Sequence, residues 1–269
     1  MKRIFLPFGR DGAENAPLDL AIQLAGKFDG KVDAKFYPRP VDSPLVDPMG
    51  VGIIDYAEKG PDFAREADEA ASVIENRLKG MGESASRVAL SKEPLRARFG
   101  IGELARMYDV TLVAKSELGD WRAVFETALF EGGRQVMLVP ESWSKPCGDN
   151  VAIAWNRSTE SARLIAQSLD TLRQAARVVI IEVEGWFVSG PDGAELANYL
   201  AIHGVKAETV MQPRSLRGPG LDILERVEAE GIDLLIKGAY TQSRLRQMVF
   251  GGATSDIISD AQVPVVFAH

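Results

Sequence analysis

Short apolar runs alternate along this chain with longer segments that carry a helical pattern. The apolar runs are continuous and rich in β-branched residues, which is typical of parallel strands covered on both faces. We expect strands at residues 3–8, 32–36, 87–90, 110–114 and 136–139, and again at 151–155, 178–182, 207–210, 234–236 and 263–267. Strands that alternate with helices of about 10–20 residues indicate parallel βαβ units.

The pattern occurs twice. Helices are expected at residues 16–28, 62–81 and 100–107 in the first half, and at 159–175, 193–203 and 221–230 in the second. Asn15 is a candidate N-cap for the first helix, and Ser158 or Thr159 caps its counterpart. A stretch rich in Pro, Cys and Gly separates the halves. The sequence therefore predicts an α/β protein of two tandem doubly wound domains, residues 1–141 and 150–269, each with a five-stranded parallel sheet.

The last expected strand of each half, 136–139 and 263–267, would leave an exposed apolar edge if it stayed unpaired. We therefore expect these two strands to pair between the domains.

Composition excludes several classes of function. The chain has 269 residues, which suits two domains, and its net charge of −7 argues against nucleic acid as a partner. No apolar run reaches the ~18 residues of a membrane span, and the start of the chain lacks a signal-peptide pattern. The single cysteine, Cys147, fits a reducing compartment. We expect a cytoplasmic protein without a membrane partner.

The segment 233–269 carries the clearest candidate chemistry. An expected strand ends on Lys237 and Gly238, a long loop with Arg244 follows, and the pair Gly251 and Gly252 precedes a short helix. A strand, a glycine loop and a helix N-terminus in this order can present backbone N–H groups to a phosphate. A tight turn before a helix would explain the glycine pair equally well.

These residues resemble the universal stress protein family in its tandem two-domain form, most closely over residues 151–183, 198–208 and the start of the chain. The resemblance implies a doubly wound sheet of the adenine nucleotide alpha hydrolase type, often dimerised through the last strand. It also implies stress response, and ATP as the ligand of many members. Their motif is Gly, two residues, Gly, nine residues, then Gly with Ser or Thr.

The motif is only partly kept. Its first and third glycines fall on Gly238 and Gly251, but Thr241 occupies the second glycine position and Gly252 replaces the Ser or Thr. Thr254, two residues on, keeps a hydroxyl. The acidic residue that usually meets the ribose is Asn156, which can bond a hydroxyl without charge assistance. The implied site consists of Trp155, Asn156, Gly238, Thr241, Arg244, Gly251, Gly252, Ala253 and Thr254.

The first half lacks properly spaced glycines after its fourth strand, so we interpret it as a degenerate copy that pairs with the second half. Catalysis finds no support, since two histidines and one cysteine lie far apart in sequence and no nucleophile elbow occurs. Asp109 and Asp233 precede matching strands, where a structural role is expected. We expect no metal and no enzyme activity.

Two hypotheses remain open. One is a stress-response protein that binds ATP or a related adenine nucleotide in its second domain. The other is a nucleotide-free adaptor that serves a protein partner on the same fold, as a homodimer or an intramolecular pseudo-dimer. A related adenine-nucleotide hydrolase or electron-transfer flavoprotein is a weaker third alternative.

Overall fold

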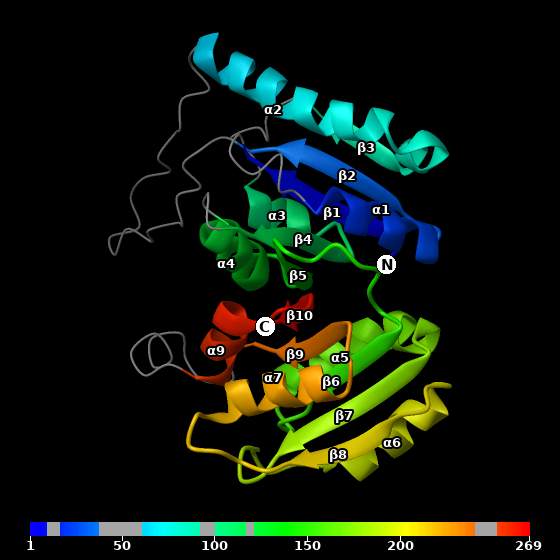
Figure 1. Ribbon diagram of the computed structural model, residues 1–269, viewed down its shortest axis with the longest axis vertical. Helices are drawn as coiled ribbons and strands as arrows, with labels where there is room; N and C mark the ends of the chain where they lie inside the picture. Colours follow the sequence, from blue (N-terminus) through cyan, green and yellow to red (C-terminus); the bar gives the residue numbers. More distant parts are fainter. Residues whose placement is uncertain (10–16, 38–60, 92–99, 117–120, 240–251) are drawn as a thin grey trace. The chain divides into compact units, whose positions relative to one another are not determined.

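The computed structural model describes residues 1–9, 17–37, 61–91, 100–116, 121–239 and 252–269, and of residues 61–63 the backbone alone. The chain divides into two compact units, Met1–Val136 and Met137–His269, each built from alternating strands and helices (Figure 1). Residues 38–60, and the expected glycine loop at 240–251, lie outside the described residues.

The first half contains five strands and the helices between them. In chain order its elements are β1 (Arg3–Phe8), α1 (Leu18–Lys27), β2 (Lys31–Phe36), α2 (Pro61–Lys79), the 3-10 helix η2 (Gly82–Arg87), β3 (Val88–Ser91), α3 (Ile101–Ala105), β4 (Val110–Lys115), α4 (Trp121–Glu131) and β5 (Gln135–Pro140). Its strand order is β3-β2-β1-β4-β5, and the pairings of β1 with β2 and β4, and of β2 with β3, are parallel.

The second half repeats this plan. Its elements are β6 (Asn150–Ala154), α5 (Thr159–Gln174), β7 (Arg177–Val183), α6 (Gly193–Ile202), β8 (Glu208–Gln212), α7 (Pro219–Ala229), β9 (Leu234–Gly238), α9 (Ala253–Asp260) and β10 (Val265–Ala268). The strands lie parallel in the order β10-β9-β6-β7-β8. This confirms the predicted α/β fold with doubly wound parallel sheets. The pairing of the last strands stays a prediction.

Four strands of the second sheet, β6, β7, β9 and β10, are covered on both faces. Every residue of β9 and β10 is buried, and β6 and β7 are buried after their first residue. Because successive side chains of a strand point to opposite faces, this burial requires cover on both sides. Helix α5 packs on β9 and β10, while α7 packs on β7 and β8 and against α9.

The predicted cap of α5 is confirmed at Ser158, whose Oγ accepts a hydrogen bond from the backbone N–H of Ser161. The structure corrects the start of α1, which begins at Leu18 with Pro17 at the N-cap. It also contains α4, for which the sequence pattern predicts no element. Four buried side chains on one stripe, Val124, Phe125, Ala128 and Leu129, explain that helix.

Asp109 and Asp233 perform the same structural task in the two halves. Asp109 accepts hydrogen bonds from the backbone N–H groups of Lys2 and Arg3 where β1 begins. Asp233 accepts from the N–H groups of residues 148–150, at 2.6 Å to Gly148 and 2.9 Å to Asn150, where β6 begins. Each carboxylate thus holds the chain that leads into the first strand of its half. The sequence predicts a structural role for both residues, and the structure shows which strands they support.

Candidate functional site

The candidate site lies at the carboxyl ends of β6 and β9. These strands are neighbours in the second sheet, and the chain winds from β6 toward β7 and β8 but from β9 toward β10. Such a reversal leaves a crevice at the carboxyl ends of the two strands, which is where doubly wound folds bind ligands. Asn156 follows β6 and Gly238 ends β9, so both residues flank this point.

Gly238 is required by close packing. A Cβ atom at this position would lie 2.6 Å from the backbone nitrogen and 2.7 Å from the Oγ of Ser161. The first turn of α5 therefore rests directly on the end of β9, and this contact alone accounts for the glycine. The glycine spacing of the motif is consequently not evidence for a phosphate by itself.

Asn156 lies inside this packing. Its side chain is buried, and Oδ1 accepts hydrogen bonds from the Oγ of Ser161 at 2.7 Å and from the N–H of Ser158 at 3.3 Å. The amide oxygen therefore helps to fix the start of α5. Neighbouring Trp155 is also buried, and its Nε1 donates to the carbonyl of Pro191.

Lys237 is the most unusual group of the site. Only 3% of its surface is exposed, and its Nζ donates hydrogen bonds to Oγ1 of Thr254 at 2.8 Å and to the carbonyl of Gly238 at 2.9 Å. The amine also lies 5.8 Å from the ring centroid of Trp186. Burial lowers the pKa of Lys237 to about 7, and the negative charge of Asp256 opposes this shift.

Thr254 brings Lys237 to the N-terminus of α9. Gly252 is the N-cap of this helix and offers no side-chain hydrogen bond, while Ala253 and Thr254 are buried in its first turn. The first N–H groups of a helix lack intrahelical partners and favour an anion. A buried amine, a hydroxyl and a helix N-terminus thus converge at one place.

A second polar cluster, which the sequence did not predict, occupies the same edge. Glu182 is buried near the end of β7, and it accepts hydrogen bonds from Nε of Arg157 at 3.0 Å and from the N–H of Gly193 at 2.9 Å. Arg157 has a φ of 65° and lies 3.8 Å from the ring centroid of Phe187. A carboxylate within the otherwise apolar run of residues 178–183 is the signal that could have identified this pair.

Of the nine predicted site residues, the structure brings Asn156, Gly238 and Thr254 together through Ser161 and Lys237. Thr241, Arg244 and Gly251 lie outside the described residues. Within the described ranges, no group of three or more His, Cys, Asp and Glu side chains could hold a metal ion. In the same ranges, no helix combines the length and apolar character that a membrane crossing needs.

No protein family model matches the chain, and no curated protein matches it. Solved structures do match. A universal stress protein from Archaeoglobus fulgidus DSM 4304 superimposes with a TM-score of 0.66 at 15% identity, over 99% of this chain and 95% of that one. A functionally unknown protein from Pseudomonas aeruginosa PAO1 gives a TM-score of 0.56 at 11% identity, over 100% and 92% of the two chains. The chain therefore has the universal stress protein fold over nearly its whole length, in the tandem form that its sequence resembles.

Proposed function

We propose that this chain is a stress-response protein of the universal stress type whose second unit binds a phosphate group of an adenine nucleotide. The observation that carries the proposal is the buried amine of Lys237. The proposed role is binding without a catalytic step.

In the part of the chain that the structure describes, the amine has neutral hydrogen-bond partners. Among the described residues, Lys237 forms no ion pair with a carboxylate, and its two acceptors are a hydroxyl and a carbonyl. Burying a cation without a counter-charge opposes folding, so such a group is usually paired or functional. A phosphate at this place would supply the missing negative charge.

The neighbours of Lys237 suit the rest of such a ligand. The hydroxyl of Thr254 and the first N–H groups of α9 are donors for phosphate oxygens. Trp186, half-buried beside the amine, offers an aromatic face to a purine base. The family motif has a Ser or Thr hydroxyl where this chain has Gly252. In the proposed site, the positive charge of Lys237 replaces the phosphate contact of that hydroxyl.

Native mass spectrometry of the purified protein, followed by thermal melting with ATP, tests the proposal. We expect either a bound mass near that of an adenine nucleotide or a rise in melting temperature with millimolar ATP. A protein that carries no ligand and melts at the same temperature with and without ATP would contradict nucleotide binding.

A second candidate, a nucleotide-free adaptor, is favoured by the position of Asn156. Its amide oxygen already accepts two hydrogen bonds within the fold. A ribose hydroxyl would have to compete with the Ser161 hydroxyl for this acceptor. If both nucleotide tests fail, the adaptor is the better account, and sedimentation of the purified chain would then show whether two copies associate.

A further inference from the structure

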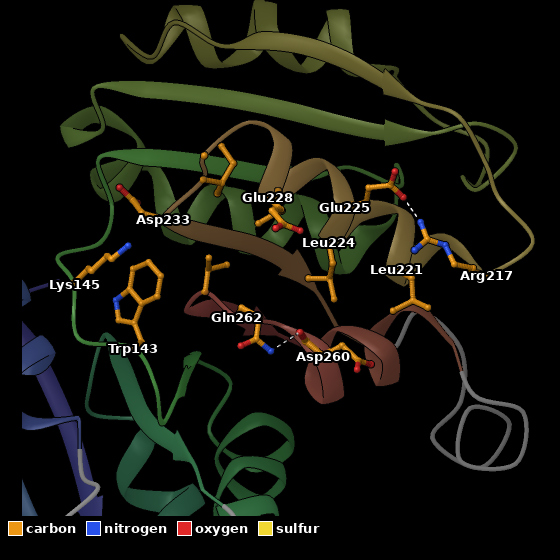
Figure 2. Close-up of a pocket in the computed structure, with 14 residues that line it drawn as sticks. Trp143, Lys145, Arg217, Leu221, Leu224, Glu225, Glu228, Asp233, Asp260 and Gln262 are labelled. Carbon is orange, nitrogen blue, oxygen red and sulfur yellow. Dashed lines mark hydrogen bonds and ion pairs between the residues drawn. The ribbon is translucent and has the colours of Figure 1, made fainter.

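A groove in the second unit lies apart from the candidate nucleotide site and shares no lining residue with it. Figure 2 shows it between α7, the chain that follows α9, and the segment that carries Trp143 and Lys145. Its volume is about 650 Å³, which is in the range of small-molecule sites. All the residues that line it belong to the second unit.

The floor of the groove is apolar and incompletely covered. Leu221 and Leu224 of α7, Val263 before β10, and Trp143 are all half-buried and line it together. Their exposed carbon surface gathers in one concave place. A ligand with an apolar body would remove this surface from water, which is favourable in proportion to the area covered.

Most of the charged residues on the rim are acidic. Two of these, Glu225 and Asp233, already have partners within the fold. Arg217 is paired with Glu225, and the carboxylate of Asp233 accepts the N–H groups of residues 148–150. Glu228 and Asp260 remain, and neither carboxylate has a hydrogen-bond or ion-pair partner in the described part of the chain.

Asp260 and Asp256 are like charges on the same helix. The Asp260 carboxylate raises the pKa of Asp256, one turn earlier on α9, after the larger effect of burial. A cation beside Asp260 would reduce this repulsion. Among the described lining residues, the cation other than the paired Arg217 is Lys145, an exposed side chain on the Trp143 side of the groove.

We propose that this groove binds a small organic cation with an apolar or aromatic body. The body lies on Leu221, Leu224 and Val263, the ring of Trp143 closes one end, and the cationic group faces the acidic rim to which Glu228 and Asp260 belong. An aromatic face beside a cation adds to the attraction. The inference does not depend on nucleotide binding.

Three probes with one body and three charges test the proposal: 4-phenylbutylamine, 4-phenylbutanol and 4-phenylbutyrate, titrated by calorimetry into the full chain. We expect the amine to bind saturably and more tightly than the alcohol, and the carboxylate to bind most weakly. In the double variant Glu228→Gln/Asp260→Asn, the affinity for the amine should fall about tenfold and approach that for the alcohol.

Two single variants are the controls. Lys145→Gln removes the opposite charge from the same rim, so the affinity for the amine should stay equal or rise. Asp170→Asn removes an exposed carboxylate of α5 that lines no part of the groove, and should change nothing. All these positions are exposed to solvent, and circular dichroism verifies that each variant is folded. No saturable binding of the amine, equal affinity for amine and alcohol, or an unchanged affinity in the double variant would each overturn the proposal.

Discussion

The amine of Lys237 donates a hydrogen bond to the hydroxyl of Thr254 over 2.8 Å, and both side chains are buried. The bond joins the end of β9 to the first turn of α9. The arrangement carries a cation without an acidic contact among the described residues, so it costs folding free energy. A buried lysine of this kind is understandable if its positive charge binds a ligand.

We predict that Lys237→Met stabilises the free protein at neutral and lower pH. Burial lowers the pKa of Lys237 from 10.5 to about 7, so below pH 7 the folded protein holds a buried charge that the variant lacks. Each pKa unit corresponds to about 1.4 kcal/mol, which makes a gain of a few kcal/mol reasonable at pH 6. Urea unfolding of both proteins measures it.

The lowered pKa of Lys237 also predicts how the free energy of unfolding changes with pH. Between pH 7 and 10.5 the unfolded chain keeps the proton of Lys237 while the folded chain loses it, so the unfolded state binds more protons. The free energy of unfolding of the wild type should therefore rise with pH relative to that of Lys237→Met. The stability advantage of the variant should shrink accordingly. Lys206→Met, at an exposed lysine, is the control. A difference that stays constant from pH 6 to 10 would contradict the assigned burial.

Gly238→Ala should destabilise the second unit whether or not a nucleotide binds. The added Cβ would lie 2.6 Å from the backbone nitrogen of Ser161, and α5 would have to move. Overpacking of this kind costs about 1–3 kcal/mol. Gly26→Ala in α1 is a matched control, because no atom lies within 4 Å of the added Cβ. That variant should gain about 0.5–1 kcal/mol from helix propensity. Denaturant unfolding compares the two, and equal stabilities would show that α5 does not rest on β9.

Asp233→Ala should leave the N–H groups of residues 148–150 without their acceptor. These groups lead into β6, so we expect a loss of about 1–3 kcal/mol in unfolding free energy. Asp109→Ala removes the equivalent acceptor ahead of β1, and its effect should be of similar size. Hydrogen exchange at Asn150 would locate the change. Protection of that amide equal to the wild type would contradict the role assigned to Asp233.

The alternation of strands and helices, the internal repeat and the Ser158 cap could all be predicted from sequence, because each depends on local pattern. The roles of Asp109 and Asp233 followed from the repeat, since matching positions suggest a shared structural task. The burial of Lys237 could not be predicted, because lysines are rarely buried and its contact with α9 comes from residues well separated in sequence. The hydrogen bonding of Asn156 could not be predicted either, because it depends on Ser161. The Ser161 hydroxyl reaches Asn156 only when α5 packs onto β9.

The proposed phosphate site is tested most directly by calorimetric titration of ATP and of adenosine into wild type and Lys237→Met at pH 7. The account predicts that wild type binds ATP at least about tenfold more tightly than adenosine, as expected for a charge-assisted phosphate contact. In Lys237→Met this preference should be lost while any adenosine binding persists, and Lys206→Met should behave as wild type. Equal ATP affinities in wild type and Lys237→Met would contradict the assignment of Lys237 to the phosphate.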